Sequence, residues 1–208
     1  MQNKDARIWN RLANGYAKSQ IKDQASFQHK LDKTQSYMRP DMRVLEIGCG
    51  TGGTAIYHAP KVAHVTGIDF SSQMIGHARE KLSASNATNV DFHVASIEEW
   101  QADGGSYDMI LGLSVLHLLQ DQTGTLARAH DLLATGGLLV TSTVCTDVIP
   151  APVRWALPLA RMVGLAPYVN APTRAGLTEM IDNAGFDIDY DWQPRKGAAV
   201  FIVARKRA

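Results

Sequence analysis

A glycine-rich loop at residues 48–53 constrains the fold of this chain more than any other feature of its sequence. The loop reads Gly-Cys-Gly-Thr-Gly-Gly; it follows the apolar run 44–47 and precedes a helical pattern that reaches His58. Glycine allows positive φ angles and a close approach of the backbone to a ligand, and the first turn of the following helix presents unpaired N–H groups. A strand, a glycine turn and a helix in this order predict an α/β domain with a ligand at the carboxyl end of its first strand.

The chain continues in the same rhythm of short apolar runs and longer helical patterns. Further strands are expected at residues 63–69, 90–95, 107–113 and 137–144, and helices at 71–82, capped by Ser71, and at 123–133. This alternation predicts a doubly wound, mostly parallel sheet with right-handed crossovers. A length of 208 residues suits a single domain of this kind.

Both ends of the chain depart from this rhythm. Residues 4–38 predict two helices, separated near Gln20, ahead of the sheet, and residues 145–172 hold five of the eight prolines, which indicates an insertion of broken helices. The pattern then predicts a helix at 174–184 and strands at 186–192 and 198–204. Because only a short turn joins these strands, we expect an antiparallel hairpin at the sheet edge in which the last strand alone runs against the others.

Composition narrows the functional classes. The formal net charge is +1, which gives no support for a nucleic-acid partner held by bulk electrostatics. Two cysteines make no disulfide framework, and residues 1–16 contain no apolar signal region, so we expect a reducing, cytoplasmic setting. The most apolar stretch, 148–169, is interrupted by Arg154, Arg161 and four prolines and cannot cross a bilayer as a regular helix.

The glycine loop alone leaves two cofactor classes open. Gly48, Gly50 and Gly53 also have the spacing of a dinucleotide-binding motif, and Asp69, which ends the second strand, would bind the ribose hydroxyls of either class. Glu46 separates the two, because a carboxylate buried in a strand needs a cationic or hydrogen-bonding partner. A ligand with an α-ammonium group supplies part of that partner, whereas a nicotinamide dinucleotide does not.

Residues 44–52, Val-Leu-Glu-Ile-Gly-Cys-Gly-Thr-Gly, resemble the S-adenosylmethionine (SAM) motif of the class I SAM-dependent methyltransferases. The resemblance continues at Gly67–Ser71 with Met74, at Tyr107-Asp108, at residues 115–117, from Leu132 to Gly137, and in the ending from residue 184 to 206. It implies a seven-stranded sheet in one domain. The expected parts are N-terminal lid helices (1–38), a SAM-binding core (43–144), a helical insertion (145–172) and a C-terminal helix and hairpin (173–208).

The resemblance also assigns roles to individual residues. It implies that SAM is held by Glu46, Gly48, Cys49, Gly50, Thr51, Gly52, Asp69, Phe70, Met74, Ser96, Ile97 and Leu113. Asp69 would bind the ribose, Phe70 and Met74 would pack near the adenine, and the Leu113 carbonyl would lie beneath the methionine portion. Ser96 is a departure, because the family often has Asp there, and this weakens the expected contact to the adenine amino group.

Methyl transfer from a sulfonium is an in-line displacement that depends on alignment and needs no metal. The seven histidines form no spaced ligand cluster, so no metal site is expected. His117 is the candidate base, and Tyr16 its candidate partner, by similarity to the phosphoethanolamine methyltransferases. Those enzymes have Asp where this chain has Leu113, so a packing role for His117 stays open, as does plain lid packing for Tyr16 and Trp9.

The acceptor is expected to be a small, partly apolar molecule methylated at O, N or S. A phospho-base or lipid amine, a thiol and a quinol or phenol remain open. The insertion is expected to influence acceptor choice, with Arg154 and Arg161 binding an anionic group, facing solvent, or facing a membrane surface that Trp155, Leu159 and Met162 contact transiently. A SAM-binding module without catalysis and a nicotinamide-dependent oxidoreductase are the alternatives.

Overall fold

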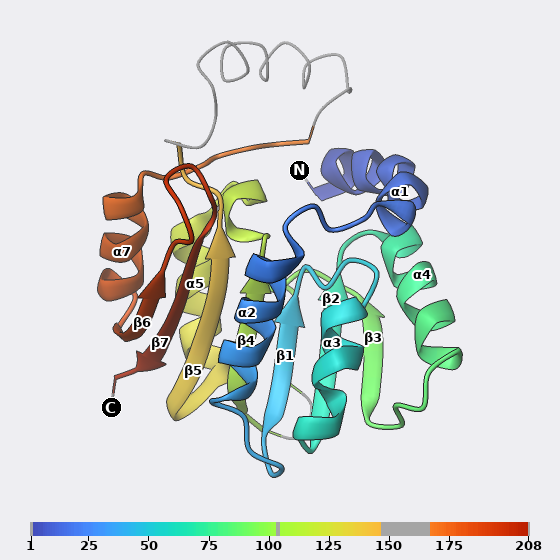
Figure 1. The fold of residues 1–208 in the computed structure, drawn as a ribbon, viewed down its shortest axis with the longest axis horizontal. Helices are drawn as coiled ribbons and strands as arrows, with labels where there is room; N and C mark the ends of the chain where they lie inside the picture. Colours follow the sequence, from blue (N-terminus) through green and yellow to red (C-terminus); the bar gives the residue numbers. More distant parts are fainter. Residues whose placement is uncertain (1, 103–104, 147–166, 208) are drawn as a thin grey trace.

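Figure 1 shows the computed structural model of the chain, which describes residues 2–102, 105–146 and 167–207. The strands of the described residues form one seven-stranded sheet in the order β3-β2-β1-β4-β5-β7-β6. They are β1 (Arg43–Ile47), β2 (His64–Asp69), β3 (Val90–Val94), β4 (Tyr107–Leu113), β5 (Leu133–Thr143), β6 (Phe186–Trp192) and β7 (Val200–Lys206). The predicted seven-stranded α/β sheet is confirmed.

Strand directions also agree with the prediction. β1 pairs in parallel with β2 and β4, β2 with β3, and β4 with β5. β7 pairs antiparallel with both β5 and β6 and is the one described strand that runs against the rest. Within the hairpin it is β6 that forms the sheet edge, while β7 lies between β5 and β6.

Helices cover both faces of the sheet. The helices are α1 (Gln2–Lys18), α2 (Gln24–Gln35), α3 (Gly53–His58), α4 (Ser72–Ser83), α5 (Gln122–Leu132) and α7 (Arg174–Asn183), with short 3-10 turns η1 (Ala59–Lys61) and η2 (Leu116–Leu118). α2 and α3 lie in front of the sheet in Figure 1, and α5 lies behind it. The arrangement is the doubly wound one that the βα rhythm predicts.

The core has two halves, one on each face of the sheet. In β1, Leu45 and Ile47 pack with residues of α5 and α7, while Val44 packs on the other face with residues of α3 and α4. All three are at most 4% exposed. Because a parallel strand in the middle of a sheet is covered on both faces, its sequence is a continuous apolar run rather than an alternating one, which makes the buried Glu46 in β1 conspicuous.

The two N-terminal helices take different positions. α1 lies beyond the carboxyl ends of the strands and next to α4 (Figure 1). Asn10 of α1 holds it there, because its side-chain oxygen accepts hydrogen bonds from the Ser71 hydroxyl (2.7 Å) and from the Gln73 backbone N–H (3.2 Å). α2 packs against the face of the sheet through the buried Leu31 and Thr34, so α1 is the helix that borders the ligand edge.

β5 begins earlier than the sequence pattern predicts. The prediction placed a break at Gly136-Gly137 and a strand from residue 137, whereas the strand runs from Leu133 to Thr143. Its register against β4 shifts between the pairs Tyr107–Leu133 and Met109–Leu138, and Gly136 has φ 73°. The glycine pair thus lies in a bulge inside the strand, where residues 134–137 of β5 lie opposite one residue of β4 and Gly136 has a left-handed backbone.

The predicted insertion falls mostly outside the described residues. Residues 147–166 are not described, and they include Arg154, Trp155, Leu159, Arg161 and Met162. Residues 167–173 lead irregularly into α7, and the Asn170 N–H donates to the His117 carbonyl at 2.7 Å. In the described part of the chain, no helix combines the length and apolar character needed to cross a bilayer.

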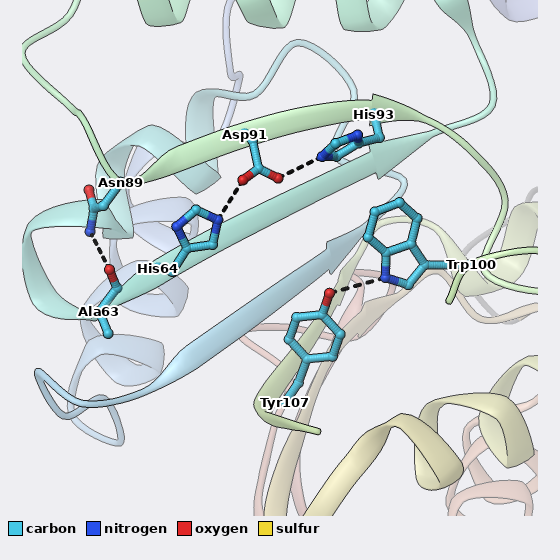
Figure 2. Close-up of polar contacts among 7 residues, drawn as sticks. All are labelled: Ala63, His64, Asn89, Asp91, His93, Trp100 and Tyr107. Carbon is cyan, nitrogen blue, oxygen red and sulfur yellow. Dashed lines mark hydrogen bonds and ion pairs between the residues drawn. The ribbon is translucent and has the colours of Figure 1, made fainter. Parts of the chain in front are cut away.

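A polar cluster joins β2 to the edge strand β3 (Figure 2). Asp91 lies between two histidines: one carboxylate oxygen contacts His64 Nε2 at 2.5 Å and the other contacts His93 Nε2 at 2.7 Å. The Trp100 indole lies 5.1 Å from the His93 ring and donates to the Tyr107 hydroxyl at 3.1 Å. These contacts hold β3 and the segment after it, which carries Ser96 and Ile97 to the ligand edge.

Acid should destabilise the fold through His58, the last residue of α3. Its side chain is fully buried, neither ring nitrogen has a hydrogen-bond partner among the described residues, and burial lowers its pKa to about 4. Below pH 6.5 the unfolded chain therefore binds a proton that the folded chain does not, and stability that is present above pH 6.5 is lost as the pH falls towards 4. Between pH 7.5 and 5 the loss from this group is about 2 kcal/mol.

His58→Leu should flatten that part of the pH dependence, as measured by urea unfolding at pH 5, 6 and 7.5. Ile56→Val on the same helix, which changes no titratable group, is the matched control and should retain the wild-type dependence. Equal pH dependence of the His58→Leu variant and the wild type would contradict the assignment.

Candidate functional site

The backbone conformation and close packing of the glycine loop exclude side chains at several of its positions. Gly48, Gly50 and Gly52 have φ angles of 61°, 53° and 73°. A Cβ on Gly48 would lie 2.5 Å from Val115 Cγ2, and one on Gly52 would lie 2.5 Å from Phe92 Cζ. The loop therefore needs glycine both for its conformation and for its close contact with the end of β4 and with β3.

Asp69, at the carboxyl end of β2, ties this loop to the neighbouring strand. One carboxylate oxygen accepts from the Gly50 N–H at 3.1 Å, and the other accepts from the Ser71 N–H at 2.8 Å. Burial raises the pKa of Asp69, and these two hydrogen bonds act in the opposite direction. Each oxygen keeps an acceptor site for a further donor, such as a ribose hydroxyl.

A cavity of about 440 Å³ opens beside Asp69. Of the residues predicted for the cofactor, Gly48, Asp69, Phe70, Ser96 and Ile97 line it. Its volume lies in the range of sites for small ligands and cofactors. Apolar walls beside the Asp69 carboxylate suit an adenosine group, whose base is flat and whose ribose carries two adjacent hydroxyls.

Residues that the sequence did not single out also line this cavity. They come from α1, from the loop after β3 and from the segment after η2, and they include Asp5, Glu98, Glu99, Leu118 and Asp121. Trp9, expected on the lid, lies here as well. No motif marks these residues; their position follows from the chain path over the carboxyl edge of the sheet.

Glu46 is the buried polar group that the fold leaves incompletely satisfied. It is 3% exposed, and its Oε2 atom has no hydrogen-bond partner among the described residues. Burial raises its pKa to about 8; the backbone N–H of Ala55 opposes this shift, and the nearby Asp69 adds to it. A carboxyl group in this state suits a cation at the loop, as the α-ammonium group of SAM would supply.

Tyr16 covers the other side of the glycine loop. Its Cε1 atom lies 3.7 Å from the position that a Cβ on Gly50 would take. The Tyr16 side chain is 52% exposed; its partial burial raises the pKa of the phenol, and the charges of Glu46 and Asp69 raise it further. The ring also meets Trp9 edge to face, with 6.3 Å between centroids. The aromatic lid predicted from α1 thus lies at the ligand edge.

A second cavity, of about 620 Å³, lies on the Tyr16 side of the loop. Cys49 and Thr51 of the loop line it, together with Lys30 of α2 and Ser114, which follows β4. Ser114 has φ 62°, a left-handed conformation unusual for a residue other than glycine. Its N–H donates to the Ser142 carbonyl at 2.8 Å, so β5 holds this turn in place.

His117 lies in the turn η2, and its side chain is buried. Burial lowers its pKa to about 4. Its Nδ1 atom accepts from the Val144 N–H at 3.4 Å, an arrangement that leaves the proton of the neutral ring on Nε2. Six of the predicted site residues lie outside the described linings of the two cavities: Glu46, Gly50, Gly52, Met74, Leu113 and His117. The roles assigned to all the predicted site residues stay predictions.

Among residues 2–102, 105–146 and 167–207, no three side chains of His, Cys, Asp or Glu come together in a way that could hold a metal ion.

Comparison with known proteins identifies the kind of domain. A family profile described as "Methyltransferase domain" matches residues 19–190, which is most of the chain. The matched range contains the glycine loop, Asp69 and the sheet up to β6.

Individual relatives are matched over shorter parts. The chain is 40% identical over 103 residues to a ubiquinone biosynthesis O-methyltransferase of Aromatoleum aromaticum, a match that covers 49% of this chain and 44% of the relative. It is 32% identical over 109 residues to phosphoethanolamine N-methyltransferase 1 of Arabidopsis thaliana, covering 52% of this chain and 22% of the relative. The chain thus spans less than half the length of these relatives.

A solved structure supports the same fold. Magnesium protoporphyrin IX methyltransferase from Synechocystis PCC 6803, solved with S-adenosylhomocysteine (SAH) bound, matches with a TM-score of 0.69 and 21% identity. The match covers 96% of this chain and 93% of that one.

Replacing Asp69 should weaken SAM and SAH binding without unfolding the protein. Asp69→Ala removes charge-assisted hydrogen bonds worth about 1.5–3 kcal/mol, so affinity should fall about ten- to a hundredfold in calorimetric titrations. Asp41→Ala, whose side chain is 72% exposed ahead of β1, is the control and should bind SAH as the wild type does. Wild-type affinity in a folded Asp69→Ala variant would show that the site is assigned wrongly.

Glu46 should release a proton when SAM binds at pH 7. With a pKa of about 8 the carboxyl is mostly protonated in the ligand-free protein, and a cation beside it favours the ionised form. Calorimetry in buffers of different ionisation enthalpy measures the number of protons released. Glu46→Gln should abolish the release, and an unchanged release in that variant would exclude Glu46 as its source.

Proposed function

The chain belongs to the methyltransferase domain family, and we propose that it moves a methyl group from SAM to an O, N or S atom of a small, partly apolar acceptor. One observation carries the proposal. The glycine loop lies between a ribose-binding carboxylate, Asp69, and a buried carboxyl, Glu46, whose free oxygen suits an ammonium group. SAM carries both complementary groups.

The described residues fit SAM along its length. The first cavity suits the adenosine, since Phe70 and Ile97 supply apolar surface and Asp69 supplies acceptors for the ribose hydroxyls. The loop glycines allow the backbone to approach the methionine portion. A Cβ atom on Gly48 would collide with Val115, and one on Gly52 would collide with Phe92. Glu46 and the Tyr16 ring border the same portion, and an aromatic face attracts a sulfonium cation by about 0.5–2 kcal/mol.

Catalysis in this proposal depends on alignment. When bound, SAM supplies a methyl group on a sulfonium: the acceptor's lone pair forms the new bond as the carbon–sulfur bond breaks, and that electron pair stays on sulfur. The residues of the chain fix the donor by its ribose and ammonium groups, and α1 covers the edge through Asn10 and Tyr16. Holding two reactants in line can supply about 7–11 kcal/mol of the barrier in well-oriented reactions.

We retain His117 and Tyr16 as the candidate catalytic residues. Tyr16 borders the loop directly, and His117 lies just after β4, on the turn that follows Ser114. A histidine of pKa about 4 is neutral at pH 7 and able to accept a proton, although as a weak base. The alternative that fits its burial is a positioning role, in which His117 orders the backbone of Val144 and Asn170.

The names of relatives support a small acceptor and leave its class open. One relative is named as an O-methyltransferase of ubiquinone biosynthesis and another as a phosphoethanolamine N-methyltransferase. A quinol or phenol, a phospho-base or lipid amine, and a thiol therefore stay as candidates, with a cytoplasmic setting and transient membrane contact as further proposals. Family membership favours methyl transfer over nicotinamide chemistry, and turnover separates an enzyme from a SAM-binding module.

Incubation with methyl-labelled SAM and a small-molecule extract of the source cells tests the proposal. The label should pass to a low-molecular-weight product that mass spectrometry identifies, and the Asp69→Ala variant should lose most of this transfer. SAM binding without transfer to any acceptor would favour the non-catalytic module.

His117→Ala, assayed with that acceptor, tests the base. If His117 removes a proton in the transition state, turnover should fall by about a hundredfold or more, and Tyr16→Phe should lower turnover as well. The control is His29→Ala on α2, outside both cavities, which should keep wild-type turnover. Full activity of a folded His117→Ala variant would exclude the base.

A further inference from the structure

The two cavities that meet at the glycine loop have opposite charge. Carboxylates border the first cavity, and its described lining contains no Lys, Arg or His: the acidic residues are Asp5, Asp69, Glu98, Glu99 and Asp121. The described lining of the second cavity has three cations, Lys30, Lys81 and Arg195, against one carboxylate, Asp23. A cationic donor such as SAM suits the first environment, whereas the second favours an anion.

The cavities share their dividing wall. Gly48 lines the first and Cys49 the second, while Val115 lines the first and Ser114 the second. The glycine loop and the turn after β4 thus each contribute one residue to either side. A molecule in the second cavity would lie next to the loop that holds the methionine portion of SAM, which is where a methyl acceptor must be.

Lys30 is the cation in the second cavity whose setting calls for a ligand. It projects from α2, and its Nζ donates to the Ser142 hydroxyl at 2.8 Å, near the carboxyl end of β5. Burial lowers the pKa of Lys30, and the more distant Asp23 carboxylate opposes that shift. Among the described residues no carboxylate is hydrogen-bonded to this ammonium, although partly buried charges are normally paired.

The carboxylate of this cavity is already engaged. Asp23 caps α2 through the Ser26 N–H and accepts from Arg195 at 2.8 Å. Lys81 Nζ donates to the Thr51 hydroxyl at 3.1 Å, so Lys81, like Lys30, donates to a neutral hydroxyl. The lining therefore holds more positive charge than its own acid neutralises.

Apolar side chains complete the second cavity. Ile21, Phe27, Leu31 and Tyr57 line it beside Tyr16. Ile21 is 46% exposed and Tyr57 is 40% exposed, so they offer apolar surface at the mouth of the cavity rather than core packing. The combination of aromatic walls with unneutralised cations suits a molecule that has an apolar body and an anionic group.

We propose that the second cavity is the acceptor site and that Lys30 selects acceptors carrying an anionic group, such as an aromatic carboxylate, on an apolar body. The proposal rests on the proposed methyltransferase function and narrows its acceptor class. In this arrangement the adenosine of the donor occupies the acidic cavity, which disfavours an anion, and the anionic acceptor enters the basic one. Lys30 is a specificity-determining residue here, because it binds the acceptor away from the atom that receives the methyl group.

A matched pair of probes tests this. 2-Naphthoate and 2-naphthamide have nearly the same shape and differ in charge, and each is titrated calorimetrically into the full-length protein, with and without saturating SAH. The naphthoate should bind at least tenfold more tightly than the amide. Lys30→Met should reduce that preference to within about twofold, while Lys30→Arg should keep most of it.

Lys33→Met is the control variant. Lys33 lies one turn further along α2 and packs over the Tyr190 ring, with Nζ 4.4 Å from the ring centroid, away from the cavity. It should retain the wild-type preference for naphthoate. SAH affinity, measured for every variant, reports folding and should stay within twofold of wild type.

Equal affinity of the wild-type protein for the two probes, including no binding of either, would overturn the proposal. An unchanged preference for naphthoate in Lys30→Met would do the same. A tenfold loss of SAH affinity in Lys30→Met would also overturn it, because it would assign Lys30 to the donor's own carboxylate. Failure of the wild-type protein to bind SAH would contradict the proposed function instead. The titrations without SAH would still test the anion site in that case.

Discussion

One carboxylate, that of Asp69, joins the parts on which the ligand edge depends. It holds the glycine loop through the Gly50 N–H and the start of α4 through the Ser71 N–H. Ser71 then caps α4 with its hydroxyl oxygen, and the same hydroxyl donates to Asn10 of α1. The loop after β1, the end of β2 and the covering helix are therefore positioned by one hydrogen-bonded chain. A ligand that binds Asp69 contacts the centre of this chain, which couples occupancy of the cavity to the position of the cover.

Features encoded by neighbouring residues could be predicted from the sequence, whereas those formed by residues far apart in the chain could not. The sheet, its strand directions and the loop were predictable because residues 44–52 combine a continuous apolar run with glycines that the backbone requires. The β-bulge at Gly136 was not, since a glycine pair signals a break and a bulge equally. Lys30 and four acidic residues of the first cavity were not predicted: Asp5, Glu98, Glu99 and Asp121. Their grouping arises where helices and loops meet in three dimensions, and no spacing along the chain indicates it.

The buried ionisable side chains of this fold differ in how fully they are hydrogen-bonded. Glu46 and Asp69 lie close together, yet Asp69 is satisfied by two backbone donors, whereas Glu46 keeps an oxygen without a partner. His58 and His117 are both buried and have pKa values near 4, so both stay neutral at physiological pH. Glu46 and His58 thus keep buried polar atoms without a partner among the described residues, and the apolar core on the two faces of the sheet offsets their cost.

The position of β7 between β5 and β6 has a consequence for how the chain folds during synthesis. β6 leaves the ribosome before the strand that links it to the sheet, so until β7 follows, its backbone N–H and C=O groups have no partner strand. Three alternate residues of β6, Asp187, Asp189 and Asp191, carry negative charge, which discourages pairing with another unfinished strand. Once β7 is in place, Arg205 and Arg207 neutralise two of them. The charges that finally stabilise this edge thus first protect it from aggregation.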